Sequence, residues 1–82
     1  MKKEKAVIIM NFKTLSKIKA VLFTKEGAAV KTIYEGEAEG VVSAEWDYKD
    51  NFGKKVQPGV YILNVRVDNA SFINTILVTD FH

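Results

Sequence analysis

The length, composition and charge of the chain already exclude several classes of protein. Its 82 residues suit a single domain, and 48% of them are hydrophobic. There is no cysteine, so neither disulfides nor thiolate-bound metals can stabilise the fold, and burial of apolar surface has to do so. The formal net charge is only +2, and the lysines are scattered among acids, which argues against a nucleic-acid partner. No apolar run approaches the roughly 20 residues of a transmembrane helix.

The chain begins with a charged leader over residues 1–5, followed by a short apolar segment. We predict that residues 6–12 form a first strand and not a secretory signal, because the apolar run stops at Asn11 and no small-residue cleavage site follows. We expect this strand to pair within its own domain. The alternative is pairing with a neighbouring molecule by strand addition, which would make the protein a polymerising or domain-swapped subunit.

Apolar and polar residues alternate along much of the chain with the period of two that is typical of β-strands. Three segments show one apolar face each, formed by Ile18, Ala20 and Leu22, by Val42, Ala44 and Trp46, and by Tyr61, Leu63, Val65 and Val67. Such alternation favours an antiparallel sheet that buries one face and exposes the other to water.

Turn-forming residues separate these segments. We expect turns at 24–27, 50–53, 57–59 and 68–71 and a small acidic loop at 36–40, because these ranges are rich in Gly, Pro, Asp, Asn or Glu. Strands are therefore predicted at 6–12, 17–24, 28–34, 41–48, 59–68 and 71–79, with a short extra piece around Lys55 and Val56. Six to seven short antiparallel strands predict an all-β sandwich of the immunoglobulin or fibronectin-III kind, with residues 1–82 forming one domain.

Residues 46–61 resemble the FlgD Ig-like family, the immunoglobulin-like domain of the flagellar hook-capping protein. The same module occurs at the carboxy terminus of many secreted bacterial proteins. That family typically reads Trp-Asp-Gly, then Asp, then Gly, then Val-Pro-x-Gly-x-Tyr. The matching positions in this chain are Trp46, Asp47, Gly53, Pro58, Gly59 and Tyr61. Residues 21–33 are similar to the family's second and third strands. Two positions depart from the pattern: Tyr48 stands where glycine is usual, and Thr24 where aspartate is usual.

The resemblance implies an immunoglobulin-like fold with a structural role, in a protein that is extracellular or displayed on the cell surface. We expect Trp46 to fill the space between sheets. Gly53 and Gly59 are expected at tight turns, with Pro58 restricting the chain just before the next strand. The motif is therefore predicted to build a corner of the fold.

Asp47, Asp50 and Asn51 lie near one predicted turn, and their oxygen atoms could bind calcium. Their spacing is not that of an EF-hand, and hydrogen bonds from these side chains to the turn backbone explain the residue types better. The only histidine is His82, the last residue, so a serine–histidine couple is not expected. The sequence predicts no catalytic residue, no metal ligand and no cofactor, and a protein that is not an enzyme.

Three aromatic residues are candidate contact residues at the surface. We expect Tyr34 and Tyr48 to cover edges of the core, and Phe52, at the tip of a turn, to be the strongest candidate. A scaffold or assembly module would use a protein partner or a second copy of the chain, joined by strand addition. If the aromatic rings formed an exposed platform, carbohydrate binding would be the alternative function.

Overall fold

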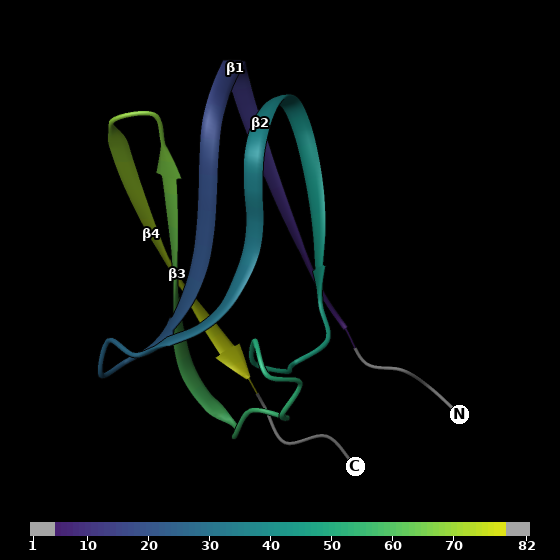
Figure 1. Cartoon of the computed structure of the whole chain (residues 1–82), viewed down its shortest axis with the longest axis vertical. Helices are drawn as coiled ribbons and strands as arrows, with labels where there is room; N and C mark the ends of the chain where they lie inside the picture. The colour runs from purple at the N-terminus through teal and green to yellow at the C-terminus, as the bar shows by residue number, and fades with distance from the viewer. Residues whose placement is uncertain (1–4, 79–82) are drawn as a thin grey trace.

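The computed structural model describes residues 5–78 and shows an all-β protein (Figure 1). Four strands, β1 (Ala6–Thr24), β2 (Ala29–Trp46), β3 (Gly59–Val67) and β4 (Ala70–Val78), form one sheet in the order β2-β1-β3-β4. All neighbouring strands are antiparallel, as the alternation predicts. Within residues 5–78, no helix is long and apolar enough to cross a membrane.

Strands β1 and β2 form a long hairpin that bends back over the rest of the sheet (Figure 1). Residues 18–23 of β1 pair with β2 on one side and with β3 on the other. Residues 6–12 of β1 pair with residues 40–46 of β2, and a register shift between Phe12 and Ser16 marks the bend. The first strand thus pairs within its own domain, as expected. We call the part formed by residues 6–12 and 40–46 the folded-over ribbon.

The number of strands differs from the prediction of six to seven. The expected strands at 6–12 and 17–24 are the two halves of β1, and those at 28–34 and 41–48 are the two halves of β2. The predicted piece around Lys55 and Val56 is a single bridge between Lys49 and Lys55.

The prediction of an acidic loop at 36–40 is wrong, because these residues remain within β2. Gly36 and Gly40 adopt φ angles of +146° and +81°, which residues with a side chain rarely adopt. The two glycines lie opposite Ile18 and Phe12, on either side of the register shift. They therefore let the strand bend while it keeps its pairing with β1.

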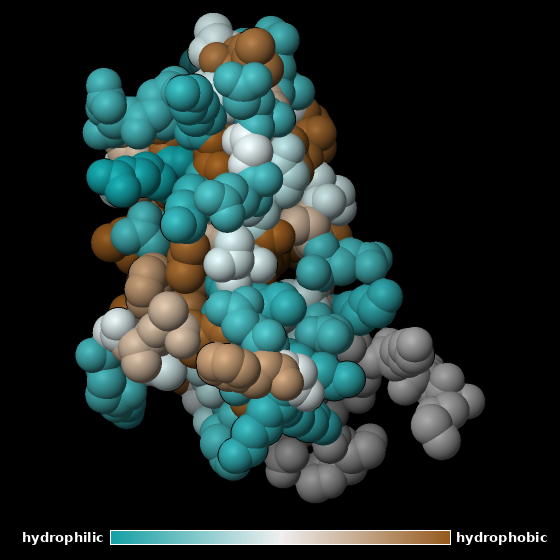
Figure 2. All heavy atoms as spheres, viewed as in Figure 1, coloured by the Kyte–Doolittle hydropathy of each residue, from teal (hydrophilic) through white to brown (hydrophobic). Residues whose placement is uncertain are grey.

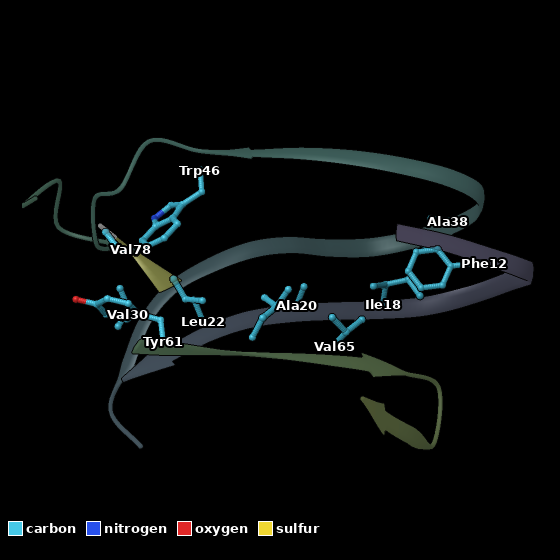
Figure 3. Close-up of a cluster of buried hydrophobic side chains, with 11 residues drawn as sticks. Phe12, Ile18, Ala20, Leu22, Val30, Ala38, Trp46, Tyr61, Val65 and Val78 are labelled. Atoms are coloured by element: carbon cyan, nitrogen blue, oxygen red, sulfur yellow. The ribbon is translucent and has the colours of Figure 1, made fainter. Parts of the chain in front are cut away.

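The core lies between the folded-over ribbon and the remainder of the sheet (Figure 3). Its buried members are Phe12, Ile18, Ala20, Leu22, Val30, Ala38, Trp46, Tyr61, Leu63, Val65 and Val78. The three faces predicted from the alternation all point inward, although Val42 and Val67 are only partly buried. Trp46 and Leu22 are the largest fully buried side chains, and Figure 3 shows Trp46 pointing from β2 toward the strands below it.

Replacing Trp46 tests whether this residue holds the ribbon on the sheet. Trp46→Ala should lower the free energy of unfolding by about 3–5 kcal/mol, because it removes the largest fully buried side chain. Trp46→Phe should cost less, because it keeps a large apolar ring and loses mainly the indole N–H. Urea unfolding followed by circular dichroism is the suitable measurement, since both variants lack the only tryptophan. A loss below about 1 kcal/mol for Trp46→Ala would contradict its place in the core.

Candidate functional site

The connection between β2 and β3 is a compact turn held by its own aspartates. The Asp50 carboxylate (Oδ1) accepts hydrogen bonds from the backbone N–H groups of Phe52 and Lys54, both at 2.9 Å. The Asp47 carboxylate accepts one from the N–H of Lys49 at 3.2 Å. The expectation that these side chains bind the turn backbone is confirmed, with one oxygen of each carboxylate accepting those hydrogen bonds.

The same connection lies against the edge of β2. The backbone N–H of Asn51 donates to the carbonyl of Val30 at 2.9 Å, and its side-chain oxygen accepts from the N–H of Thr32 at 3.2 Å. These two bonds occupy backbone groups that an outer strand would otherwise leave open to another chain. Asn51 therefore covers part of the β2 edge.

Trp46 and Tyr61 fasten the two ends of the connection to the core. The indole Nε1–H of Trp46 donates to the carbonyl of Lys49 at 2.9 Å, and the hydroxyl of Tyr61 donates to the carbonyl of Gln57. The two rings meet edge to face, with centroids 6.0 Å apart. Both residues are thus members of the core that also bind the backbone of this connection.

Gly53 of the motif lies in a turn, as expected, whereas Gly59, also expected at a tight turn, is the first residue of β3. Gly53 ends the turn by donating its N–H to the carbonyl of Asp50 at 3.0 Å. Pro58 is exposed directly before β3, which begins at Gly59, and no sheet partner needs an N–H at that position.

The three candidate contact residues differ sharply in exposure. Phe52 is 95% exposed at the tip of the turn. Tyr34 and Tyr48 are half-buried and pack against the core, which confirms their expected places at its edges. The Tyr34 hydroxyl donates to the carbonyl of Glu37 at 3.2 Å, and the Tyr48 ring lies 5.0 Å from that of Trp46. Phe52 is therefore the one of the three whose ring is almost entirely in solvent.

Tyr48 has a strained backbone at the position where the resembled family has glycine. Its φ angle is +62°, in the left-handed region that costs a residue with a side chain roughly 1–2 kcal/mol. The ring packs on Trp46, and the carbonyl of Tyr48 accepts a hydrogen bond from the N–H of Val56 at 2.9 Å. The packing of the ring offsets the energetic cost of this backbone conformation, which glycine would adopt without strain.

A shallow depression on the outer face of the sheet is a feature that sequence reasoning missed. It has a volume of about 550 Å³, and its polar lining includes Lys19, Thr32, Asn64, Arg66 and Ser71. These residues come from four different strands, so no local pattern in the sequence brings them together. Among the residues that the structure describes, the polar groups of this lining are an amine, a guanidinium, an amide and two hydroxyls.

Besides Phe52, Leu15 and Val60, exposed large apolar side chains gather on two segments of the sheet. One is the outer face of the folded-over ribbon, where Val7, Ile9 and Val41 are exposed. The other is β4, the last strand of the sheet, where Phe72, Ile73 and Leu77 are between 56% and 67% exposed. The space-filling view in Figure 2 shows apolar patches between the polar side chains on the face that it presents. We call the long edge of β4 that points away from β3, together with these three side chains, the β4 edge.

Comparisons with known proteins reveal no relative: no family model, curated protein or solved structure matches this chain. The resemblance to the FlgD Ig-like family therefore rests on the residues of the motif alone.

Two substitutions of Tyr48 separate the strain of its backbone from the packing of its ring. Tyr48→Ala loses the ring and keeps a side chain at positive φ, whereas Tyr48→Gly loses the ring and relieves the strain. We expect Tyr48→Gly to be more stable than Tyr48→Ala by about 1 kcal/mol, the reverse of the usual order within a strand. Urea unfolding monitored by tryptophan fluorescence measures both. Equal stabilities, or a more stable alanine variant, would contradict the strained conformation.

Proposed function

We propose that this protein is a non-catalytic structural and interaction module that associates through an exposed strand edge. The observation that carries the proposal is the β4 edge, whose three large apolar side chains lie in solvent on the outermost strand. Monomeric proteins rarely expose such side chains together on an unprotected strand, and edges of this kind recruit further strands.

We further propose that the bent sheet is a reduced form of an immunoglobulin-like sandwich. Two features support this architecture: the folded-over ribbon encloses the core as a second layer, and the Tyr61 hydroxyl bonds to a carbonyl four residues earlier. A tyrosine near the start of a strand that bonds back to the preceding corner is typical of immunoglobulin domains. By the resemblance of residues 46–61, the module would serve as a scaffold or assembly domain of an exported or cell-surface protein.

Carbohydrate binding is the second candidate function, and the exposure of Phe52 is the observation that favours it. An aromatic ring that is 95% exposed can stack on a sugar ring. A pull-down with insoluble polysaccharides tests this idea, with Phe52→Ala as the variant. Retention of the parent and loss of the variant would support sugar binding, whereas no retention of the parent would remove it.

Mass in solution as a function of concentration tests the interaction module. We expect the average mass to rise above that of the 9.2 kDa monomer as the protein is concentrated. The rise should be reversible on dilution, because strand addition involves no covalent bond. Analytical ultracentrifugation over a wide concentration range is the measurement. A strictly monomeric protein at millimolar concentration would exclude self-association.

A further inference from the structure

The β4 edge is the least protected edge of the sheet. Natural proteins protect outer strands with charges, proline, bulges or a covering loop. The nine residues of β4 include no charged residue and no proline, and their pairing with β3 runs through Ala70–Val78 without a register shift. At the opposite edge of the sheet, β2 contains several glutamates, and its pairing with β1 has register shifts. Asn51 also covers part of the β2 edge.

The two faces of β4 follow from its pairing with β3. Ile73 and Leu77 lie opposite Asn64 and Val60, so they are on the outer face of the sheet. Phe72 lies opposite the buried Val65 and is on the core face, yet it remains 56% exposed. The folded-over ribbon therefore leaves the core face of β4 partly uncovered at Phe72.

We propose that β4 pairs with β4 of a second copy, antiparallel and about a two-fold axis at Thr75. This inference rests on the proposed function and names the surface and the partner. It places Ile73 opposite the second copy's Leu77, Phe72 opposite its Val78, and Thr75 opposite its own equivalent. The result is a continuous sheet in which the outer strands of both copies become central, and the same patch serves on both sides.

Two-fold symmetry and side-chain matching select this register. A two-fold axis perpendicular to the sheet keeps both cores on the same side of the joined sheet. Because facing residues share one face, this axis must pass between a residue and the same residue of the second copy. An axis at Asn74 would place Ile73 opposite Thr75 and Leu77 opposite Ser71, so that both exposed aliphatic side chains of the outer face would meet polar ones. On the outer face, the axis at Thr75 pairs Ile73 with Leu77 and threonine with threonine, which are favourable cross-strand pairs. On the core face it places Asn74 opposite Ile76.

The second uncharged strand segment, residues 6–12 of β1, is less suited to the same symmetry. A two-fold axis at Ile9 would pair this whole segment with itself. It would also place Lys5 directly opposite the second copy's Lys13, and like charges in facing positions are destabilising. Within β4 itself no charge opposes the pairing.

The expected dimer is weak and reversible. Phe72, Ile73 and Leu77 are 56%, 67% and 67% exposed. Together with the neighbouring backbone they offer on the order of 400 Å² per copy, an interface of the small class found in transient complexes. The dissociation constant should accordingly lie between micromolar and millimolar.

Single cysteines test the register, because the natural chain has none. In Thr75→Cys the two thiols face each other across the axis at a separation that a disulfide can bridge. In the matched control Ser71→Cys, on the same strand and face, the two thiols lie roughly 26 Å apart. We expect mild oxidation of concentrated protein to give a disulfide-linked dimer of Thr75→Cys and little dimer of Ser71→Cys. Equal cross-linking of both, or none of Thr75→Cys, would overturn the proposed pairing.

A charge placed on the axis provides a second readout. Thr75→Lys sets two ammonium groups opposite each other and should raise the dissociation constant at least roughly 10-fold. The control Ser43→Lys adds the same charge at an exposed position of the folded-over ribbon and should leave association unchanged. If the parent associates and Thr75→Lys associates equally well, the β4 pairing is wrong while the interaction module stands. If the parent stays monomeric at millimolar concentration, both proposals fail.

Discussion

The burial of Trp46 is the interaction on which the rest of this structure depends. A two-stranded ribbon is only marginally stable in water, so residues 6–12 and 40–46 need an apolar contact with the sheet below them. Trp46, the last residue of β2, provides that contact at 1% exposure and packs edge to face on Tyr61. Its indole N–H also binds the carbonyl of Lys49, so the same side chain shapes the start of the connection to β3.

The bent hairpin explains both the stability of the fold and its open edge. With a single folded-over ribbon as the upper layer, the core can be covered over β1 and β3, where Leu22, Leu63 and Val65 are almost completely buried. Much of β4 lies beyond this cover. The exposure of its apolar side chains is therefore a consequence of the architecture, and it is the observation behind the proposed association.

Particular residues show which parts of the structure could be predicted from the sequence. The alternation of Ile18, Ala20 and Leu22 predicted their common buried face, and Asp50 with Gly53 predicted a turn that the hydrogen bonds confirm. Gly36 and Gly40 led to the wrong prediction of a loop at 36–40, because a glycine in a sequence can indicate either the end of a strand or a bend within it. The positive φ of Tyr48 could be suspected only from the glycine of the resembled family, since tyrosine itself gives no such signal.

The sequence by itself determined the all-β class, the faces that the strands bury and most of the turns, because alternation and turn chemistry are local properties of a few neighbouring residues. The tertiary structure alone decided that two pairs of predicted strands are continuous, that the order is β2-β1-β3-β4, and that β4 is the exposed edge. It also assembled the depression on the outer face from four strands. These features depend on pairing between residues that are distant in the chain, and a local sequence pattern does not specify which strands become neighbours.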